Sequence, residues 1–487
     1  MSGERIVVLG AGPAGLAVAD AASEHGHKVV IVDDNHAPGG QIWRGGPAQW
    51  ADPRAERLWR SLSKRAEVEV LGGARVVAAA GPRTLLIESA DGPLALPWSR
   101  LILCTGAREL LLPFPGWTLP GVTGAGALQA LLKGGMPIAG KRVVVAGTGP
   151  LLLAVADAVQ RHGGIVAAIV EHQGTAALAR FGARLALSHR GKFVQALRLM
   201  AGLRRVPYLR GALVRQACGD GVLASVQVEQ AGRRREIACD FLACGFGLVP
   251  ALETASLFGC ATGSGSVTVD SFQRTSVDGV WAAGESTGIG GVDQALAQGR
   301  IAGLDAVGKQ ASDRERRAVD AAHDFARLLA ATFAAPAAIR DVCQGSTMVC
   351  RCEDVTAAAL ADKGNWREAK LQTRVGMGPC QGRVCGAACT FLYGWSCSAS
   401  RPPVQPAQAS TLASVGAPVT NSKAARLAPD GHESHHQERC QSGVMSLRRP
   451  TLLCCCCLPP SSMSSGVWRL ARFENPVSSS MFWSAAR

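Results

Sequence analysis

Short apolar runs alternate along the chain with longer segments whose apolar positions have helical spacing. The first run covers residues 5–9 and is followed by a glycine turn, the helix-like stretch 16–22 and a second run at 28–32. The same order returns with runs at 141–146 and 165–170. Because strands buried on both faces have continuous apolar sequences, this pattern predicts an α/β fold with parallel sheets.

The composition fits a folded chain with several domains. A length of 487 residues suggests about three domains. Apolar residues make up 47% of the chain, which excludes a largely disordered protein. The 57 glycines follow no period of three, which excludes a collagen-like chain and favours an α/β enzyme with many tight turns.

The charge of +14 does not by itself predict a nucleic-acid partner. After residue 395 there are nine Lys and Arg against four Asp and Glu, and the remaining excess is spread without a long basic run. The basic stretch 180–210 has no clear phosphate-binding pattern, so we interpret it as a solvated helix face. With aromatic residues at 5%, stacking platforms for bases are sparse and no nucleic acid is expected.

No leader or membrane span is expected. The N-terminal apolar run stops at Gly10, and the longest apolar candidate, residues 143–159, contains two glycines, a proline and an aspartate. We expect a cytoplasmic protein, either free or peripheral at the inner face of the membrane. In that compartment thiols stay reduced, and cysteine clusters more often bind metal.

The first glycine turn has the fingerprint of a dinucleotide site. Gly10 permits the tight turn after the strand, Gly12 lets the backbone approach a pyrophosphate, and Gly15 lets the helix pack on the strand. Ala14 lies within the same turn, where the helix N-terminus favours anions. Asp33 ends the next strand 23 residues after Gly10, where its carboxylate can accept hydrogen bonds from ribose hydroxyls.

Three further short motifs favour FAD as the dinucleotide. Each follows an apolar run, and they contain the candidate binding residues Gly40, Gln41, Thr105, Gly106, Gly284 and Glu285. Together the motifs resemble the thioredoxin-reductase-like and glutathione-reductase-like flavoproteins, which have two Rossmann-like FAD and NAD(P) domains. The resemblance implies that Glu285, where the family usually has Asp, meets the ribityl chain. It also implies that a helix starting at Gly291 and Val292 faces the flavin C2 carbonyl and stabilises reduced, anionic flavin. A plain loop at 288–291 is the alternative.

The second glycine turn departs from the fingerprint. Gly147 and Gly149 are present, but Leu152 replaces the third glycine. Leu152 should push the helix away from its strand or be absorbed by a small neighbour such as Ala146. The resemblance implies an NAD(P) domain, in which Glu171 would disfavour the 2′-phosphate of NADP. NAD(H), another nucleotide such as ATP, and a scaffold without nucleotide all stay open.

Thiol–disulfide reduction is not expected. No Cys pair follows Gly40. The inserted domain and its edges have no CxxC pair, since their cysteines are Cys218, Cys239, Cys244 and Cys260. Cys104 and Cys244 lie in apolar strands and are interpreted as core residues.

Four cysteines near the C-terminus have the spacing CxC-x27-Cx4C, and they are Cys350, Cys352, Cys380 and Cys385. Two close pairs of thiolates can hold two bridged irons as a [2Fe-2S] cluster. Nearby glycines let backbone N–H groups approach the sulfides, and Arg351, Arg374 and Arg383 can offset the negative charge. A structural zinc is the alternative, although zinc sites favour gaps of two to four residues.

The cysteine segment resembles the bacterioferritin-associated-ferredoxin-like [2Fe-2S] domain. Joined to an FAD/NAD(P)-type reductase, it resembles the larger subunits of opine oxidases, dye-linked proline or hydroxyproline dehydrogenases and hydrogen cyanide synthase, over residues 3–395. The resemblance implies an FAD domain at 1–115 and 246–308, an inserted NAD(P)-like domain at 116–245, a helical linker at 309–340 and a small helical [2Fe-2S] domain at 341–396.

The same resemblance implies a function in electron transfer. A smaller FAD-dependent subunit that resembles amino-acid oxidases would oxidise an amino acid or opine-type amine. Electrons would then pass through this chain to a quinone-like acceptor, and a small ferredoxin-like subunit is a further expected partner. We assign no catalytic residue. The alternatives are a stand-alone NADH:acceptor reductase and a redox-sensing assembly subunit.

The chain changes character after residue 396. Residues 397–487 are Ser-rich and aperiodic, with a run of four cysteines at 454–457. We expect this tail to be disordered and hypothesise a shifted reading frame or read-through. Intact-mass measurement of protein from its native host tests the hypothesis.

Overall fold

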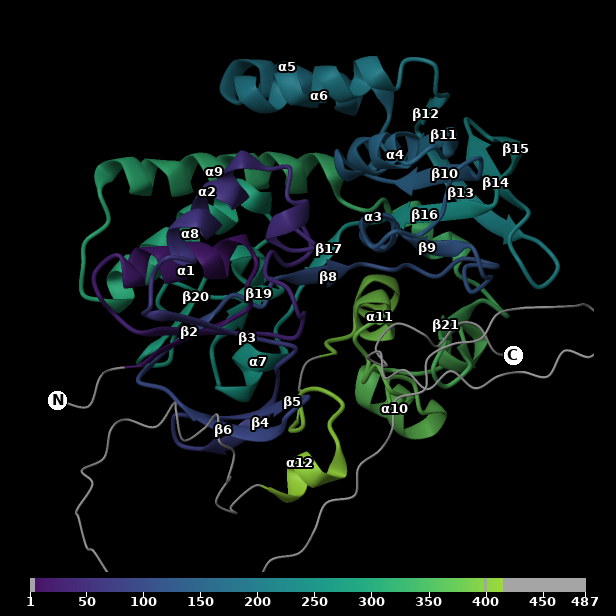
Figure 1. Ribbon diagram of the computed structural model, residues 1–487. Helices are drawn as coiled ribbons and strands as arrows, with labels where there is room; N and C mark the ends of the chain where they lie inside the picture. The colour runs from purple at the N-terminus through teal and green to yellow at the C-terminus, as the bar shows by residue number, and fades with distance from the viewer. Residues whose placement is uncertain (1–4, 398–400, 415–487) are drawn as a thin grey trace, which may run out of the picture. The chain divides into compact units, whose positions relative to one another are not determined.

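Figure 1 shows the computed structural model, which describes residues 5–397 and 401–414. Its first sheet has five strands, each parallel to its neighbours, in the order β20-β7-β1-β2-β3. These strands are β1 (Ile6–Leu9), β2 (Val29–Asp33), β3 (Val68–Gly72), β7 (Arg100–Leu103) and β20 (Val280–Ala282). A strand from residue 280 thus completes a sheet begun near residue 6, so this domain is interrupted in sequence.

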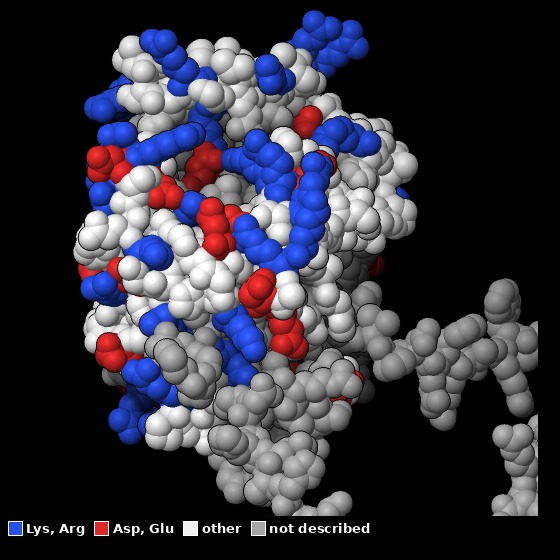
Figure 2. Space-filling view, turned by 60° about the vertical axis from the view of Figure 1, so that its left-hand side comes forward, with Lys and Arg blue, Asp and Glu red and all other residues white. Residues whose placement is uncertain are grey.

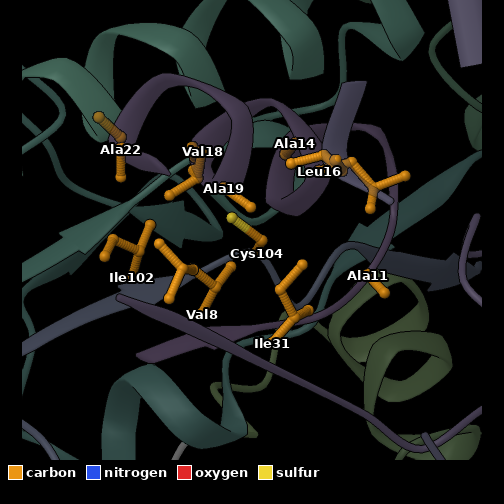
Figure 3. Packing of buried hydrophobic residues seen from close by; sticks show 14 of the residues in the cluster. Val8, Ala11, Ala14, Leu16, Val18, Ala19, Ala22, Ile31, Ile102 and Cys104 are labelled. Atoms are coloured by element: carbon orange, nitrogen blue, oxygen red, sulfur yellow. The ribbon is translucent and has the colours of Figure 1, made fainter. Parts of the chain in front are cut away.

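Helices α1 (Pro13–Ser23) and α8 (Gly291–Ala306) pack together and share a core with the sheet. Val8 and Ile31 of the strands are fully buried and pack with Leu16 of α1 (Figure 3). Cys104 lies in the same cluster, and burial raises the pKa of its thiol. The interpretation of Cys104 as a core residue is therefore confirmed.

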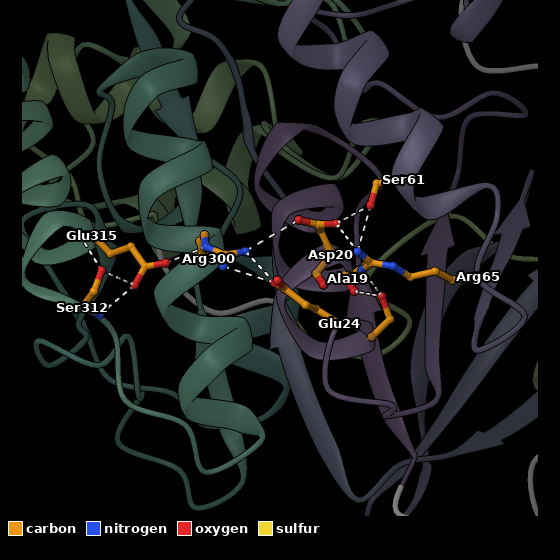
Figure 4. A network of polar contacts seen from close by, with 9 residues as sticks. Ala19, Asp20, Glu24, Ser61, Arg65, Arg300, Ser312 and Glu315 are labelled. Atoms are coloured by element: carbon orange, nitrogen blue, oxygen red, sulfur yellow. Dashed lines mark hydrogen bonds and ion pairs between the residues drawn. The ribbon is translucent and has the colours of Figure 1, made fainter.

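A polar network around Arg300 of α8 ties three helices together (Figure 4). The Arg300 guanidinium pairs with Asp20 of α1 at 3.6 Å and with Glu24 at 3.2 Å. It also pairs at 2.6 Å with Glu315, which forms the capping box of α9 (Asp313–Phe333) with Ser312. These contacts hold α9, which the sequence predicts as a linker helix, against the first domain.

The second sheet is also parallel, in the order β12-β11-β10-β16-β9. Its strands are β9 (Val122–Gly124), β10 (Arg142–Gly147), β11 (Ile165–Glu171), β12 (Tyr208–Arg210) and β16 (Phe241–Gly245). Leu152, in α4 (Leu151–Arg161), is fully buried in a core shared with α3 (Ala125–Lys133). Two parallel strand–helix units are present, and the predicted α/β class is confirmed.

Smaller sheets accompany the two parallel ones. An antiparallel pair joins β8 (Ala107–Glu109) to β17 (Leu248–Pro250), on the two segments that run between the parallel sheets. Antiparallel three-stranded sheets are formed by β4 (Arg75–Gly81), β5 (Thr84–Ser89) and β6 (Gly92–Pro97), and by β13 (Ala212–Cys218), β14 (Ser225–Gln230) and β15 (Arg233–Ala238). In the part of the chain that the structure describes, no helix is long and apolar enough to span a bilayer.

The cysteine segment has its own small core. It contains β21 (Met348–Cys350), β22 (Val355–Thr356), α10 (Trp366–Thr373) and α11 (Cys385–Tyr393). Residues 401–414, which the sequence assigns to the tail, fold back onto the β4–β6 sheet and end in α12 (Ala409–Ala413). There the Val404 N–H donates to Val77 O at 2.8 Å, and the Gln408 N–H donates to the Glu88 carboxylate at 2.7 Å. The remaining tail, including the cysteine run at 454–457, lies outside the described residues.

Candidate functional site

Two positions of the first glycine turn are packed so closely that only glycine fits. Gly10 has φ +108°, and a Cβ there would lie 2.2 Å from Cys104 O. A Cβ at Gly15 would lie 1.8 Å from Gly10 O. Helix α1 starts after Gly12 without a side-chain cap, so its first N–H groups are free to bind an anion. The turn therefore fits a pyrophosphate.

Asp33 fixes the same turn from the end of β2. Its carboxylate is buried and accepts from the Ala11 N–H at 2.5 Å and from the Asn35 N–H at 2.7 Å. The Asn35 side-chain amide also donates to Asp33 at 2.8 Å. A carboxylate has about four acceptor positions, so about one position remains for a ribose hydroxyl. The turn also contacts the second glycine motif, because a Cβ at Gly40 would lie 3.0 Å from Gly12 Cα. Gln41 follows and is exposed.

The predicted helix start is present, since α8 starts at Gly291. That its N-terminus faces a flavin stays a prediction. Glu285 accepts from the Gly291 N–H at 3.2 Å, and burial raises the pKa of its carboxyl group. Glu285 thus reaches the helix N-terminus that the resemblance places opposite the flavin. Val292 follows in the first turn and packs on the first core. Thr105 donates its hydroxyl to Ala251 O at 2.9 Å, beside Gly106.

Two residues of this site escaped the sequence analysis. Gln298 accepts from the Gly284 N–H at 2.9 Å and so holds the Gly-acid turn on α8. Asp293, in the first turn of α8, pairs with Arg54 and with Lys192, each at 2.6 Å. Helical spacing from Gly291 could have indicated Gln298, but no local signal pairs Asp293 with a lysine about a hundred residues away.

The second glycine turn repeats the first one. Glu171, which is 1% exposed, accepts from the Gly149 N–H at 3.0 Å and from the Gln173 N–H at 2.9 Å. Burial raises the pKa of Glu171. Gly147 has φ +143°, and a Cβ there would lie 2.0 Å from Gly245 O. The predicted absorption of Leu152 occurs, but Gly245 provides the space rather than Ala146, because a Cβ at Gly245 would lie 3.1 Å from Leu152.

The end of α9 covers this second turn. A Cβ at Gly149 would lie 3.5 Å from the ring of Phe333, which also meets Phe181 edge-on at 4.8 Å between centroids. The Gln173 side-chain amide donates to Ala334 O at 3.2 Å. A nucleotide pyrophosphate that approaches Gly149 would therefore meet the Phe333 ring.

The four predicted cysteines converge. The Cys385 thiol, on the first residue of α11, is close enough to Cys350 and Cys380 to shift their pKa values, and Cys352 likewise affects the pKa of Cys380. The contact with Cys385 lowers the pKa of Cys350 to about 6 and that of Cys380 to about 5. Within residues 5–397 and 401–414, however, no three His, Cys, Asp or Glu side chains stand in an arrangement that would hold a metal ion.

Backbone amides also point at these sulfurs. The Gly376 N–H hydrogen-bonds Cys350, and the Gly382 N–H hydrogen-bonds Cys380. A Cβ at Gly378 would lie 2.3 Å from Cys352 Cβ. Each iron of a [2Fe-2S] cluster takes only two cysteine ligands, so the cluster does not need three side chains around one ion. Four converging thiols with nearby amides and glycines fit such a cluster in residue type and number.

The three arginines of the cysteine segment have different neighbours. Arg374 pairs with Glu353 at 2.7 Å, and Arg351 lies over the Trp117 ring at 4.9 Å. Arg383 donates to Cys380 O at 3.3 Å and lies 3.8 Å from Glu253, at the start of α7 (Glu253–Leu257). Glu253 pairs in turn with Arg108 of β8 at 2.7 Å. The pairs join the cysteine loop to the turn at Thr105 and Gly106.

An interrupted dinucleotide domain, an inserted second one and a Gly-acid turn before a helix define a flavoprotein oxidoreductase with two dinucleotide folds. The sequence profile of the pyridine nucleotide-disulphide oxidoreductase family matches residues 4–299, and the chain belongs to this family. It is a flavin-dependent oxidoreductase.

Similar proteins are known in two named enzyme systems. An opine oxidase subunit from Rhizobium meliloti is 32% identical over 423 residues, which cover 79% of this chain and 91% of that protein. Hydrogen cyanide synthase subunit HcnB of Pseudomonas aeruginosa is 30% identical over 427 residues, covering 79% and 92%. The crystal structure of L-proline dehydrogenase from P. horikoshii has a TM-score of 0.61 at 17% identity over 84% of this chain and 80% of its own, and it shares the fold.

Proposed function

We propose that the chain is the FAD- and [2Fe-2S]-containing subunit of a heteromeric enzyme that oxidises an amino acid or an opine-type secondary amine. The converging cysteines, joined to a flavin-type domain whose site has no dithiol, are the observation that carries the proposal. Two similar proteins, named as subunits of opine oxidase and hydrogen cyanide synthase, support the heteromeric part. The amine donor is inferred from these names and from the structurally similar proline dehydrogenase.

The FAD would lie along the carboxyl edge of the first sheet. Its pyrophosphate would sit at the N-terminus of α1 between Gly10, Gly12, Ala14 and Gly15, with Asp33 on the adenosine ribose. The flavin end would face the remaining predicted residues, namely Gly40, Gln41, Thr105, Gly106, Gly284, Glu285, Gly291 and Val292. Bound FAD supplies the two-electron acceptor that the chain lacks.

The four cysteines would hold the [2Fe-2S] cluster, which exchanges electrons singly. The part of this chain is to keep Cys350, Cys352, Cys380 and Cys385 together, to donate backbone N–H groups to them and to exclude water around the buried Cys350 and Cys385. Zinc remains the competing occupant, and metal analysis separates the two.

Substrate oxidation is assigned to a partner. We propose a smaller FAD-dependent subunit that resembles amino-acid oxidases, and a quinone-like acceptor and a ferredoxin-like subunit complete the path. The competing NADH:acceptor reductase would need Gly147, Gly149 and Glu171 to bind NAD(H), and the Phe333 ring over Gly149 weighs against it.

The test uses the purified full chain, alone and co-expressed with the partner. Alone it should bind FAD, contain iron and acid-labile sulfide in equal amounts, and show a [2Fe-2S] EPR signal after reduction, without oxidising amino acids. With the partner, an amine substrate should reduce both cofactors. Zinc without sulfide, amino-acid turnover by the chain alone, or rapid flavin bleaching by NADH would each contradict the proposal.

A further inference from the structure

A helical hairpin of the inserted domain has one covered side and one open side. It consists of α5 (Thr175–Ser188) and α6 (Arg190–Gly202), shown at the top of Figure 1. Its inner side meets α9, where His189 packs on Phe325 at 5.3 Å between ring centroids. No described element covers the outer side. Accordingly, α6 has no buried residue, and α5 has one, Leu185.

The open side of the hairpin is basic and contains no acid. No Asp or Glu occurs between Glu171 and Asp220. Lys192 forms an ion pair with Asp293 at 2.6 Å, so its charge is neutralised. The other basic residues of the hairpin, and the two that follow α6, are exposed and form no ion pair with any described residue. These residues are Arg180, Arg184, Arg190, Arg198, Arg204 and Arg205. In Figure 2 the uppermost part of the molecule accordingly shows Lys and Arg without Asp or Glu.

Aliphatic side chains share this open side with the arginines. Leu187 is 78% exposed, Leu197 48%, Val194 44% and Met200 43%. Residues 190, 194, 197, 198 and 201 lie on one helix face, because they are spaced by three or four. Arginine and aliphatic side chains therefore project together from α6. An ordinary solvated helix face would mix charges of both signs and would not expose so many aliphatic residues.

We propose that this basic hairpin surface, made of the exposed residues of α5 and α6 with Arg204 and Arg205, docks on an anionic lipid bilayer. Guanidinium groups bind lipid phosphates, and the aliphatic side chains enter the boundary of the acyl region. Each added basic residue near an anionic surface raises the affinity about fivefold. Nucleic acid is a poorer occupant because the surface has no exposed aromatic platform. The inference is independent of the cofactors and goes beyond the proposed function.

A lipid surface also suits this arrangement better than a protein partner. Protein interfaces have a contiguous apolar centre with a polar rim. Here Val194, Leu197 and Met200 alternate with arginines along α6, and α5 adds Leu187. This is the composition of helices that lie in a membrane interface.

Co-sedimentation of the full chain with lipid vesicles tests the proposal. The wild type should bind vesicles that contain phosphatidylglycerol, should not bind pure phosphatidylcholine, and should be released by high salt. The double variant Arg190→Glu/Arg198→Glu should bind the anionic vesicles at least about tenfold more weakly. The apolar variant Leu187→Ser/Leu197→Ser should weaken binding without changing its salt dependence.

The matched control is Arg233→Glu/Arg235→Glu on the exposed strand β15, which changes the net charge equally. It should stay within about twofold of the wild type, and equal FAD content and circular dichroism should show that all variants fold. Failure of the wild type to bind anionic vesicles would overturn the proposal. An equal loss of vesicle binding in the control variant would also overturn it. So would hairpin variants that no longer bind a partner subunit but still bind vesicles as the wild type does. None of these outcomes depends on amine oxidation, so the proposed function is tested separately.

Discussion

One acidic residue in each dinucleotide fold accepts hydrogen bonds from the backbone of the glycine turn. The Asp33 carboxylate accepts from the Ala11 N–H of the turn and from the Asn35 N–H. The Glu171 carboxylate likewise accepts from the Gly149 N–H and from the Gln173 N–H. The extra methylene of glutamate lets it reach one residue further along the turn. Each sequence motif indicates an acid at a strand end, but which amide the carboxylate takes depends on a backbone turn 22 residues away.

Glycine at position 15 is required by this packing, and its replacement is the first prediction. In Gly15→Ala the new Cβ would lie 1.8 Å from Gly10 O, so α1 must shift. We expect the variant to lose about 2–4 kcal/mol of unfolding free energy and most of its FAD. Gly182→Ala is the control, because it lies in α5 with open space around it and should gain up to ~1 kcal/mol. Urea unfolding and flavin absorbance check both, and equal stabilities would contradict the packing argument.

His172 provides a prediction of pH dependence. Its two ring nitrogens are buried without a hydrogen-bond partner in the described structure, and burial lowers its pKa to about 4. The unfolded chain has a histidine pKa of about 6.5, so between pH 6.5 and 4 it binds more protons than the folded chain. The contribution of His172 protonation to the unfolding free energy is thus near zero above pH 7, and it becomes increasingly unfavourable as pH falls toward 4.

We expect unfolding free energy to fall by about 2 kcal/mol more between pH 7 and pH 5 in the wild type than in His172→Phe. The phenylalanine keeps a ring against Phe246, which stacks on His172 at 5.7 Å. Urea titrations at both pH values measure the difference. Parallel curves for the two proteins would show that His172 is protonated in the folded state.

At the scale of elements, local patterns predicted what local contacts build. The apolar runs gave β1, β2, β10 and β11, and the glycine motif before residue 291 gave the start of α8. The spacing of four cysteines predicted their convergence. The sequence indicated residues 180–210 as a solvated helix face, but it did not indicate that aliphatic side chains are exposed there beside the arginines. Nor did it indicate the return of residues 401–414 to Glu88. Those features depend on contacts between residues far apart in sequence, which periodicity does not encode.

The cover over the second glycine turn is such a contact, and it gives the third prediction. Removing the ring in Phe333→Ala opens the space beside Gly149. We expect the affinity for NADH, measured by calorimetry, to rise roughly tenfold, or about 1.4 kcal/mol. Phe325→Ala removes a ring from the same helix near His189 and should change the affinity little. Equal affinities in the wild type and both variants would mean that Phe333 does not obstruct the site.

At the scale of the molecule, the cysteine segment has polar contacts with both dinucleotide domains. The Trp117 indole, in the inserted domain, donates to Met348 O at 2.6 Å. Glu253, in the first domain, lies between Arg108 at 2.7 Å and Arg383 of the cysteine segment at 3.8 Å. Although burial opposes it, Arg108 holds the pKa of Glu253 below its usual value. One carboxylate thus neutralises two arginines at the junction between the proposed flavin and cluster sites.

Replacing this carboxylate is the fourth prediction. Glu253→Gln keeps the shape but leaves Arg108 and Arg383 without their counter-charge, which should cost about 2–4 kcal/mol because both are mostly buried. The exposed pair Arg316–Asp313 is the control, and Asp313→Asn should cost less than ~1 kcal/mol. Urea unfolding measures the difference.

Stopped-flow reduction of the assembled enzyme should also show slower electron transfer from flavin to cluster in Glu253→Gln. If unfolding and transfer are both unchanged, the Arg108–Glu253–Arg383 chain does not hold the two sites together.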